Sequence, residues 1–202
     1  MKIKNIHIEN EGYVYCRSKF YSVQDILPCG ASYDFAMGKN ELTGEIDSGV
    51  WAASYLLSMY GVNKQDFILF QPPQVTVNGT HLSLEALSAY TCYMDEMYPL
   101  FSDESKVNTL VTRELEKSKL KYTSMEVKDL FQVENERFER PLAGVGNEIF
   151  RAMAAIGFAA NKQVFCFPWL SKMRFGSYHG HLLNVLDILE SLGKMIVLPT
   201  GK

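Results

Sequence analysis

Two glycines, Gly44 and Gly49, limit the fold more than any other feature, because they enclose a four-residue loop between an apolar run and a helix-like segment. The apolar run, residues 33–37, predicts a buried strand that leads into the loop. The segment after Gly49 carries large apolar residues at the spacing of a packed helical face, namely Trp51, Tyr55, Leu56 and Met59. The sequence therefore predicts a strand–loop–helix unit in which Trp51 faces the interior.

The loop and the first residues after it follow the spacing G-x-x-x-x-G-K-[ST] of a phosphate-binding loop. In such a loop backbone N–H groups bind phosphates, the lysine contacts them, and the Ser/Thr hydroxyl holds Mg²⁺. Here Val50 occupies the lysine position and Trp51 the Ser/Thr position, so the frame is kept and its chemical groups are not. An ordinary strand–loop–helix turn gives the same pattern. A second register, in which Gly38 and Lys39 belong to the phosphate loop, also fits.

Composition narrows the class of protein. The 202 residues, 47% hydrophobic and 12% aromatic, suit one domain with a substantial core. A net charge of −3 without a basic stripe argues against nucleic acid as a partner. No signal sequence and no run of about 18 apolar residues is present, so we expect a cytoplasmic protein that does not itself span a membrane. The cysteines are scattered without a C-x-x-C pair, which predicts reduced thiols and no metal site.

The order of segments along the chain predicts a mixed α/β fold. Asn78-Gly79 between two β-like runs is the preferred sequence of a type I′ hairpin turn. Residues 95–140 are charged and helix-periodic, which indicates a small helical subdomain inserted in the α/β body. The apolar runs 164–167 and 195–198 alternate with helical segments, a pattern typical of parallel sheets.

This order resembles the nucleotide-binding domain of ATP-binding-cassette (ABC) transporters, from about Ile3 to the end of the chain. An antiparallel start precedes the phosphate-loop frame and the Asn-Gly hairpin. Cys92-Tyr93-Met94-Asp95 then stands where such domains reach the Q-loop, and Leu142-Ala143-Gly144-Val145-Gly146 stands where LSGGQ belongs. The last two apolar runs match the Walker B strand and the strand before the switch histidine. The resemblance implies one P-loop NTPase-like (ABC ATPase-like) domain over residues 1–202: a mixed sheet, an antiparallel N-terminal β part and the inserted helical subdomain.

The resemblance also shows that each position that does chemistry in the family holds a different residue here. Besides Val50 and Trp51, Asp95 (or Glu96 in the other register) replaces the Q-loop glutamine, Ala143 the signature serine, Pro168 the Walker B aspartate, Trp169 the general-base glutamate, and Gly201 the switch histidine. It implies no catalytic residue and no metal ligand. The implied nucleotide site is a degenerate phosphate loop (Gly44, Ser48, Gly49, Val50, Trp51) with a degenerate signature (Gly144, Gly146).

The functional expectation is a pseudo-ATPase: a catalytically inactive ABC-type domain that acts as a binding or regulatory subunit of a membrane transport system. No cofactor is expected, although the loop backbone can still bind ATP or another anion. The alternative is an ABC transporter ATP-binding protein that binds nucleotide through a divergent phosphate loop. A third hypothesis, an unrelated small-molecule enzyme on a P-loop-like body, lacks a nucleophile–base pair. Expected partners are a membrane transporter subunit or another ABC ATPase. The contact, formed without ATP, is expected through aromatic surface at residues 98–101 and 169–175. Such a partner would also place the chain at the membrane.

Overall fold

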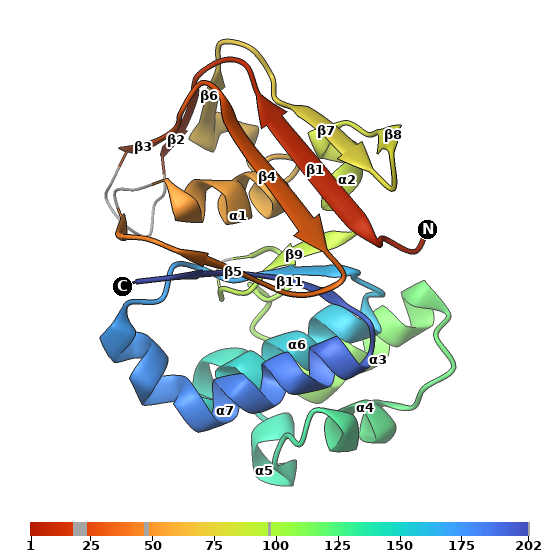
Figure 1. Ribbon diagram of the computed structural model, residues 1–202. Helices are drawn as coiled ribbons and strands as arrows, with labels where there is room; N and C mark the ends of the chain where they lie inside the picture. The colour runs from red at the N-terminus through yellow and green to blue at the C-terminus, as the bar shows by residue number, and fades with distance from the viewer. Residues whose placement is uncertain (18–23, 47–48, 97, 202) are drawn as a thin grey trace.

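A parallel sheet lies at the centre of the fold, with helix α1 on one face and helices α6 and α7 on the other (Figure 1). The computed structural model describes residues 1–17, 24–46, 49–96 and 98–201. The parallel sheet has the strand order β5 (Gly38–Thr43), β11 (Met195–Thr200), β10 (Val164–Cys166) and β9 (Thr91–Tyr93). All six residues of β11 are buried, as an internal parallel strand covered on both faces requires. The predicted parallel sheet is therefore confirmed.

Two antiparallel sheets lie on the far side of α1. One has the order β4 (Ala31–Ala36), β1 (Asn5–Asn10), β7 (Gln74–Val77), β8 (Thr80–His81), and the other β3 (Gln24–Leu27), β2 (Val14–Arg17), β6 (Phe67–Leu69). The turn between β7 and β8 has φ of 52° at Asn78 and 77° at Gly79. Positive φ at both central residues is the mark of a type I′ turn, so the predicted hairpin is confirmed.

The strand that leads into the glycine loop differs from the one predicted. Residues 31–36 form β4, which pairs with β1 in an antiparallel sheet. The strand before the loop is β5, which pairs in parallel with β11. Because β5 is an edge strand, Lys39, Glu41 and Thr43 remain exposed, and the strand lacks the continuous apolar run that the prediction relied on.

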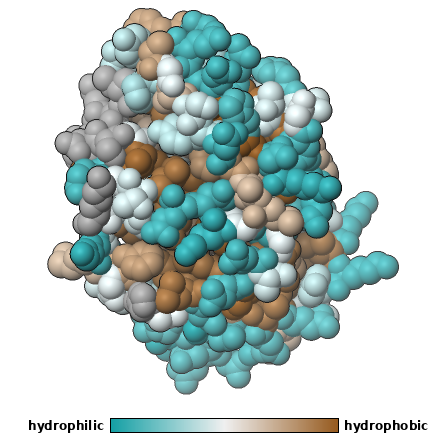
Figure 2. All heavy atoms as spheres, viewed as in Figure 1, coloured by the Kyte–Doolittle hydropathy of each residue, from teal (hydrophilic) through white to brown (hydrophobic). Residues whose placement is uncertain are grey.

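Seven α-helices lie in the described part of the chain: α1 (Val50–Met59), α2 (Leu84–Ser88), α3 (Val107–Ser118), α4 (Ser124–Leu130), α5 (Asn135–Phe138), α6 (Ile149–Ala159) and α7 (Lys172–Ser191). Short 3₁₀ turns occur at Lys64–Asp66, Leu142–Gly144 and Gly146–Glu148. Helices α3 to α5 form the inserted helical part, in which α3 and α4 pack against α6 and α5 packs against α3 (Figure 1). Hydrophilic side chains cover this lower end of the molecule (Figure 2). None of the described helices combines the length and the apolar content needed to cross a lipid bilayer.

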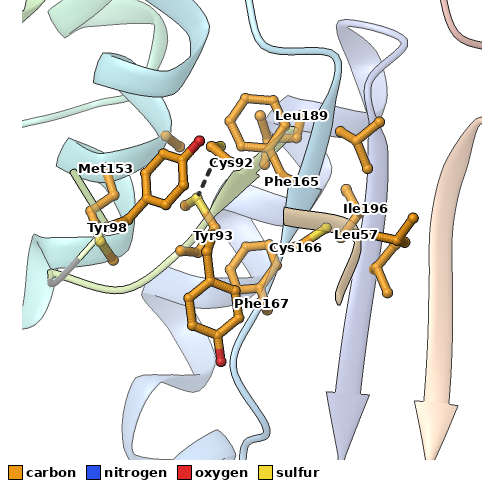
Figure 3. Packing of buried hydrophobic residues seen from close by; sticks show 14 of the residues in the cluster. Leu57, Cys92, Tyr93, Tyr98, Met153, Phe165, Cys166, Phe167, Leu189 and Ile196 are labelled. Atoms are coloured by element: carbon orange, nitrogen blue, oxygen red, sulfur yellow. Dashed lines mark hydrogen bonds between the residues drawn. The ribbon is translucent and has the colours of Figure 1, made fainter. Parts of the chain in front are cut away.

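The core occupies both faces of the parallel sheet. In Figure 3, labelled residues of the strands lie between Leu57 of α1 on one side and Met153 of α6 on the other. Two buried hydroxyls fix α1 to the sheet: Ser54 Oγ donates to Phe167 O at 2.7 Å, and Thr91 Oγ1 donates to Leu57 O at 3.1 Å. The position of α1 over the sheet is thus set by hydrogen bonds as well as by apolar packing.

Candidate functional site

The carboxyl ends of the four parallel strands meet at one edge of the sheet. Gly44 follows β5, Gly201 follows β11, residues 167–170 follow β10, and residues 94–96 follow β9. In open α/β sheets ligands bind outside this carboxyl edge, so the predicted site residues that follow these strands lie where the fold places a ligand.

The glycine loop ends in a left-handed residue. Gly49 is the residue before α1 and has φ of 78°, a conformation that an L side chain adopts at a cost. Its carbonyl accepts a hydrogen bond from Ala52 N at 3.0 Å. Gly44 N donates to Thr200 O at 2.9 Å, which joins the start of the loop to the end of β11. Ser48, the remaining predicted loop residue, lies outside the described residues.

Val50 and Trp51 begin α1, and neither provides the group that a phosphate site needs. Val50 is half-buried, and the Trp51 side chain is fully buried. The Trp51 ring packs edge-to-face on Tyr55, with centroids 5.7 Å apart. The prediction that Trp51 faces inward is confirmed: the residue at the magnesium-hydroxyl position is part of the core.

Tyr55 continues this buried aromatic cluster towards the sheet. Its hydroxyl donates to Asp66 Oδ2 at 2.8 Å, and its ring meets Tyr93 at 5.2 Å between centroids. Burial, and next the hydrogen bond to Asp66, raise the pKa of the Tyr55 phenol far above its usual range. The nearby Asp95 carboxylate acts in the same direction. Tyr55 therefore stays neutral and is a structural group.

Trp169 occupies the centre of the carboxyl edge. Its indole Nε1 donates to Gly44 O at 3.0 Å, so the side chain reaches from the end of β10 to the end of β5. It also passes against Gly201: a Cβ on Gly201 would lie 3.0 Å from Trp169 Cζ2. The residues at the general-base and switch positions therefore lie against each other, and a histidine at position 201 would require this indole to shift.

The helix that follows the predicted signature loop begins later in the chain than expected. Gly144 and Gly146 are exposed and lie in two 3₁₀ turns, and α6 begins only at Ile149. Gly146 has φ of 66°, which extends the loop before the helix starts. The two turns pack on α6 and α7, across the parallel sheet from α1. The degenerate signature and the glycine loop are thus separate features within this chain.

A buried carboxylate that the sequence analysis did not single out holds this loop. Glu148 Oε2 accepts a hydrogen bond from Glu134 N at 3.0 Å. Its other oxygen lies 3.9 Å from Arg151 Nη1 and 4.0 Å from Arg137 Nε, and Arg137 Nη1 donates to Val145 O at 2.7 Å. A single Glu before a helix does not signal such a network, because only Arg151 is close in sequence and the partner Glu134 N is 14 positions away.

The alternative register with Gly38 and Lys39 in the phosphate loop is wrong. Both residues belong to β5, and Lys39 pairs with Ile196 of β11. The Lys39 ammonium is exposed and lies 3.7 Å from the Glu41 carboxylate. Gly38 is at the amino end of β5, at the opposite edge of the sheet from Gly44, so Lys39 is not part of the loop.

Comparison with known proteins supports the fold. No protein-family model matches the chain, and no curated protein matches its sequence. A putative ABC transporter ATP-binding protein from Pyrococcus furiosus is 13% identical with a TM-score of 0.62, over 98% of this chain and 92% of that chain. MJ1267, an ATP-binding cassette of an ABC transporter in its ADP conformation, is 11% identical with a TM-score of 0.64, over 100% and 82%. The chain has the fold of an ABC transporter ATP-binding domain.

A longer solved structure contains the same fold as one part. A bacterial Atm1-family ABC exporter with ATP bound is 11% identical with a TM-score of 0.55. The match covers 99% of this chain but only 34% of the exporter chain. The predicted α/β fold class, with its parallel and antiparallel sheets and inserted helices, agrees with the fold shared with these ABC structures.

Proposed function

We propose that this chain is an ABC-type ATP-binding domain that does not hydrolyse ATP and that serves as a binding or regulatory subunit of a membrane transport system. The observation that carries the proposal is the place of Trp169, whose indole joins Gly44 to Gly201 across the carboxyl edge. The proposed site keeps Gly44, Ser48, Gly49, Val50 and Trp51 as a degenerate phosphate loop, with Gly144 and Gly146 as a degenerate signature. The proposed domain extends over residues 1–202, with its helical subdomain at about 95–140.

Phosphoryl transfer to water depends on groups that neutralise phosphate charge, hold a metal ion and orient the attacking water. In this chain Val50 supplies no charge, Trp51 is buried in the core, and Pro168 and Trp169 carry no carboxylate. A hydrogen bond to a charged group contributes about 1.5–3 kcal/mol, so loss of the lysine alone weakens nucleotide binding roughly tenfold to a hundredfold. Loss of the metal ligands and the base removes the chemical step itself.

The proposed partner is a membrane transporter subunit or another ABC ATPase, and the proposed location is the cytoplasmic side of a membrane. One part of the predicted contact surface is wrong, because Tyr98 and Phe101 are only 4% and 2% exposed and belong to the core. Trp169 and Phe175 are half-buried, while Met173 beside them is 79% exposed. We therefore restrict the proposed contact surface to the start of α7.

A phosphate-release assay with Mg²⁺ and ATP tests the proposal. We expect no release above a heat-inactivated control. The matched variant is Val50→Glu, which places an acid in the first turn of α1, where it favours the helix but repels a bound phosphate. If the wild type releases phosphate and Val50→Glu does not, the proposed inactivity is wrong and the divergent-loop alternative is supported.

Light scattering after size-exclusion chromatography tests the second half of the proposal. The molar mass of the chain, alone or with a candidate transporter subunit, should be the same with and without ATP, because the phosphate loop and the signature both lack their ligand side chains. A dimer that forms only with ATP would contradict the regulatory role.

A further inference from the structure

A cavity lies at the carboxyl edge of the sheet, on the face covered by α6 and α7. Its volume is about 330 Å³, at the lower end of the ≈300–1,000 Å³ typical of small-molecule sites. It is lined by the turn after β9, the first residues of α6, the segment after β10 and the first two turns of α7. Since α1 and the glycine loop lie across the sheet, this cavity is distinct from the degenerate phosphate loop.

The floor of the cavity is apolar and well packed. It includes Phe150, Met153 and Leu170, which are 6%, 2% and 3% exposed. The Phe150 ring lies between Phe167 and Tyr178, with centroid distances of 5.7 and 5.3 Å. Figure 3 shows Met153 among the packed side chains of the core. A floor held from both sides in this way is suited to an apolar group about the size of one side chain.

The walls of the cavity carry opposite charges. Glu96 stands in the turn after β9, and Arg174 in the first turn of α7. Both side chains are exposed, and within the described parts of the chain neither makes an ion pair or a side-chain hydrogen bond. Asp95, which is half-buried, lines the cavity beside Glu96. A ligand that enters therefore meets a cationic group from α7 and an anionic group from the turn after β9.

We propose that this cavity binds a small zwitterion with an apolar body, namely a free amino acid such as leucine or phenylalanine. The ammonium group lies towards Glu96, the carboxylate is held by the guanidinium fork of Arg174, and the side chain rests on Phe150 and Met153. A water molecule takes about 30 Å³, so the cavity has room for roughly ten water-sized groups, the scale of one such amino acid.

The charge balance of the walls selects among other small ligands. The Glu96 carboxylate repels a phosphate or a nucleotide, and the Arg174 guanidinium disfavours a ligand that is only a cation. A neutral apolar molecule would make no ionic interaction with Glu96 or Arg174. The inference goes beyond the proposed function and stands whether or not the chain hydrolyses ATP.

Isothermal titration calorimetry without nucleotide tests the inference, with leucine, N-acetyl-leucine and leucine amide as probes. Leucine should bind, and each blocked analogue should bind roughly tenfold to a hundredfold more weakly, because each lacks one charged partner. Arg174→Gln should weaken leucine and leave leucine amide unchanged. Glu96→Gln should weaken leucine and leave N-acetyl-leucine unchanged.

The control variant is Lys172→Gln, which removes an exposed charge from the same helix without lining the cavity, and leucine affinity should not change. Since all three substituted side chains are exposed, the variants should keep the wild-type circular dichroism spectrum. The inference is wrong if no apolar amino acid binds, or if Arg174→Gln binds leucine as well as the wild type. It is equally wrong if both blocked analogues bind as tightly as leucine, which would assign the cavity to a segment of a partner protein.

Discussion

Replacement of Trp51 by threonine restores the residue type that a phosphate-binding loop requires at this position, and we expect it to damage the fold. The Trp51 side chain is fully buried and packs on Tyr55, which in turn contacts Tyr93 of the parallel sheet. Truncation of a well-packed tryptophan costs about 3–5 kcal/mol of stability. Since domains are stable by about 5–15 kcal/mol, this is a large part of the total.

The corresponding change in melting temperature is measurable. For a domain of about 150–250 residues each kcal/mol shifts the midpoint by about 2–4 °C, so Trp51→Thr should melt roughly 6–20 °C below the wild type. Urea unfolding followed by far-ultraviolet circular dichroism gives the free energy directly, with an unchanged slope if the cause is lost packing. Tryptophan fluorescence is unsuitable, because the substitution removes one of the two tryptophans.

Val50→Lys is the matched control for the same motif. Val50 is half-buried, and a lysine there can extend its ammonium group to solvent, so the cost should be about 1 kcal/mol or less. The double variant should be as unstable as Trp51→Thr and should still release no phosphate from ATP, because groups that act together in catalysis are not additive. A Trp51→Thr protein within about 0.5 kcal/mol of the wild type would refute the assignment of Trp51 to the core.

Three further predictions concern other parts of the molecule. Thr123→Ala removes the capping box at the start of α4 and should lower the free energy of unfolding in urea by about 0.5–2 kcal/mol. Amide hydrogen exchange should become faster in α4 alone, and an equal increase over the whole chain would contradict this prediction. In the native protein only Cys29 should react rapidly with a thiol reagent, since the other three cysteines are buried, and Cys29→Ser should then show no rapid reaction. The pKa of the Asp103 carboxyl is lowered to about 2, first by hydrogen bonds from Ser105 and next by Arg113. Because the folded pKa lies below the ordinary value, the contribution of the Asp103 carboxylate to stability is present above about pH 4 and is lost as the pH falls towards 2. NMR titration of the wild type and of Arg113→Gln can follow this carboxyl group.

Local patterns were sufficient to predict several elements. The Asn78-Gly79 turn and the inward face of α1 depend on residues close together in sequence, and both are confirmed. The strand before the glycine loop was missed for a physical reason. Residues 38–43 are polar because β5 is an edge strand, whereas residues 31–36 alternate as part of a two-sided antiparallel sheet.

The candidate site was only partly predictable from the sequence. The resemblance placed Trp169 at the position of an acid, but its hydrogen bond to Gly44, 125 positions away, depends on how β5 and β10 are arranged around β11. The same holds for the cavity: Glu96 and Arg174 become neighbours of one hollow only when β9 and α7 pack at the same edge. No pattern of single residues signals either arrangement.

The position of β11 between β5 and β10 also determines when the chain can complete its fold. The Asn40 side chain of β5 donates a hydrogen bond to Ile196 O of β11, and the two residues are 156 positions apart in sequence. Until residues 195–200 have been synthesised, β5 and β10 share no neighbour, and the apolar surfaces of α1 and α7 lack their common sheet. Contacts of such long range form slowly and leave strand edges open to aggregation. Substitutions in β11 should therefore affect the yield of folded protein during synthesis more than those in the hairpin β7–β8, which forms from adjacent residues.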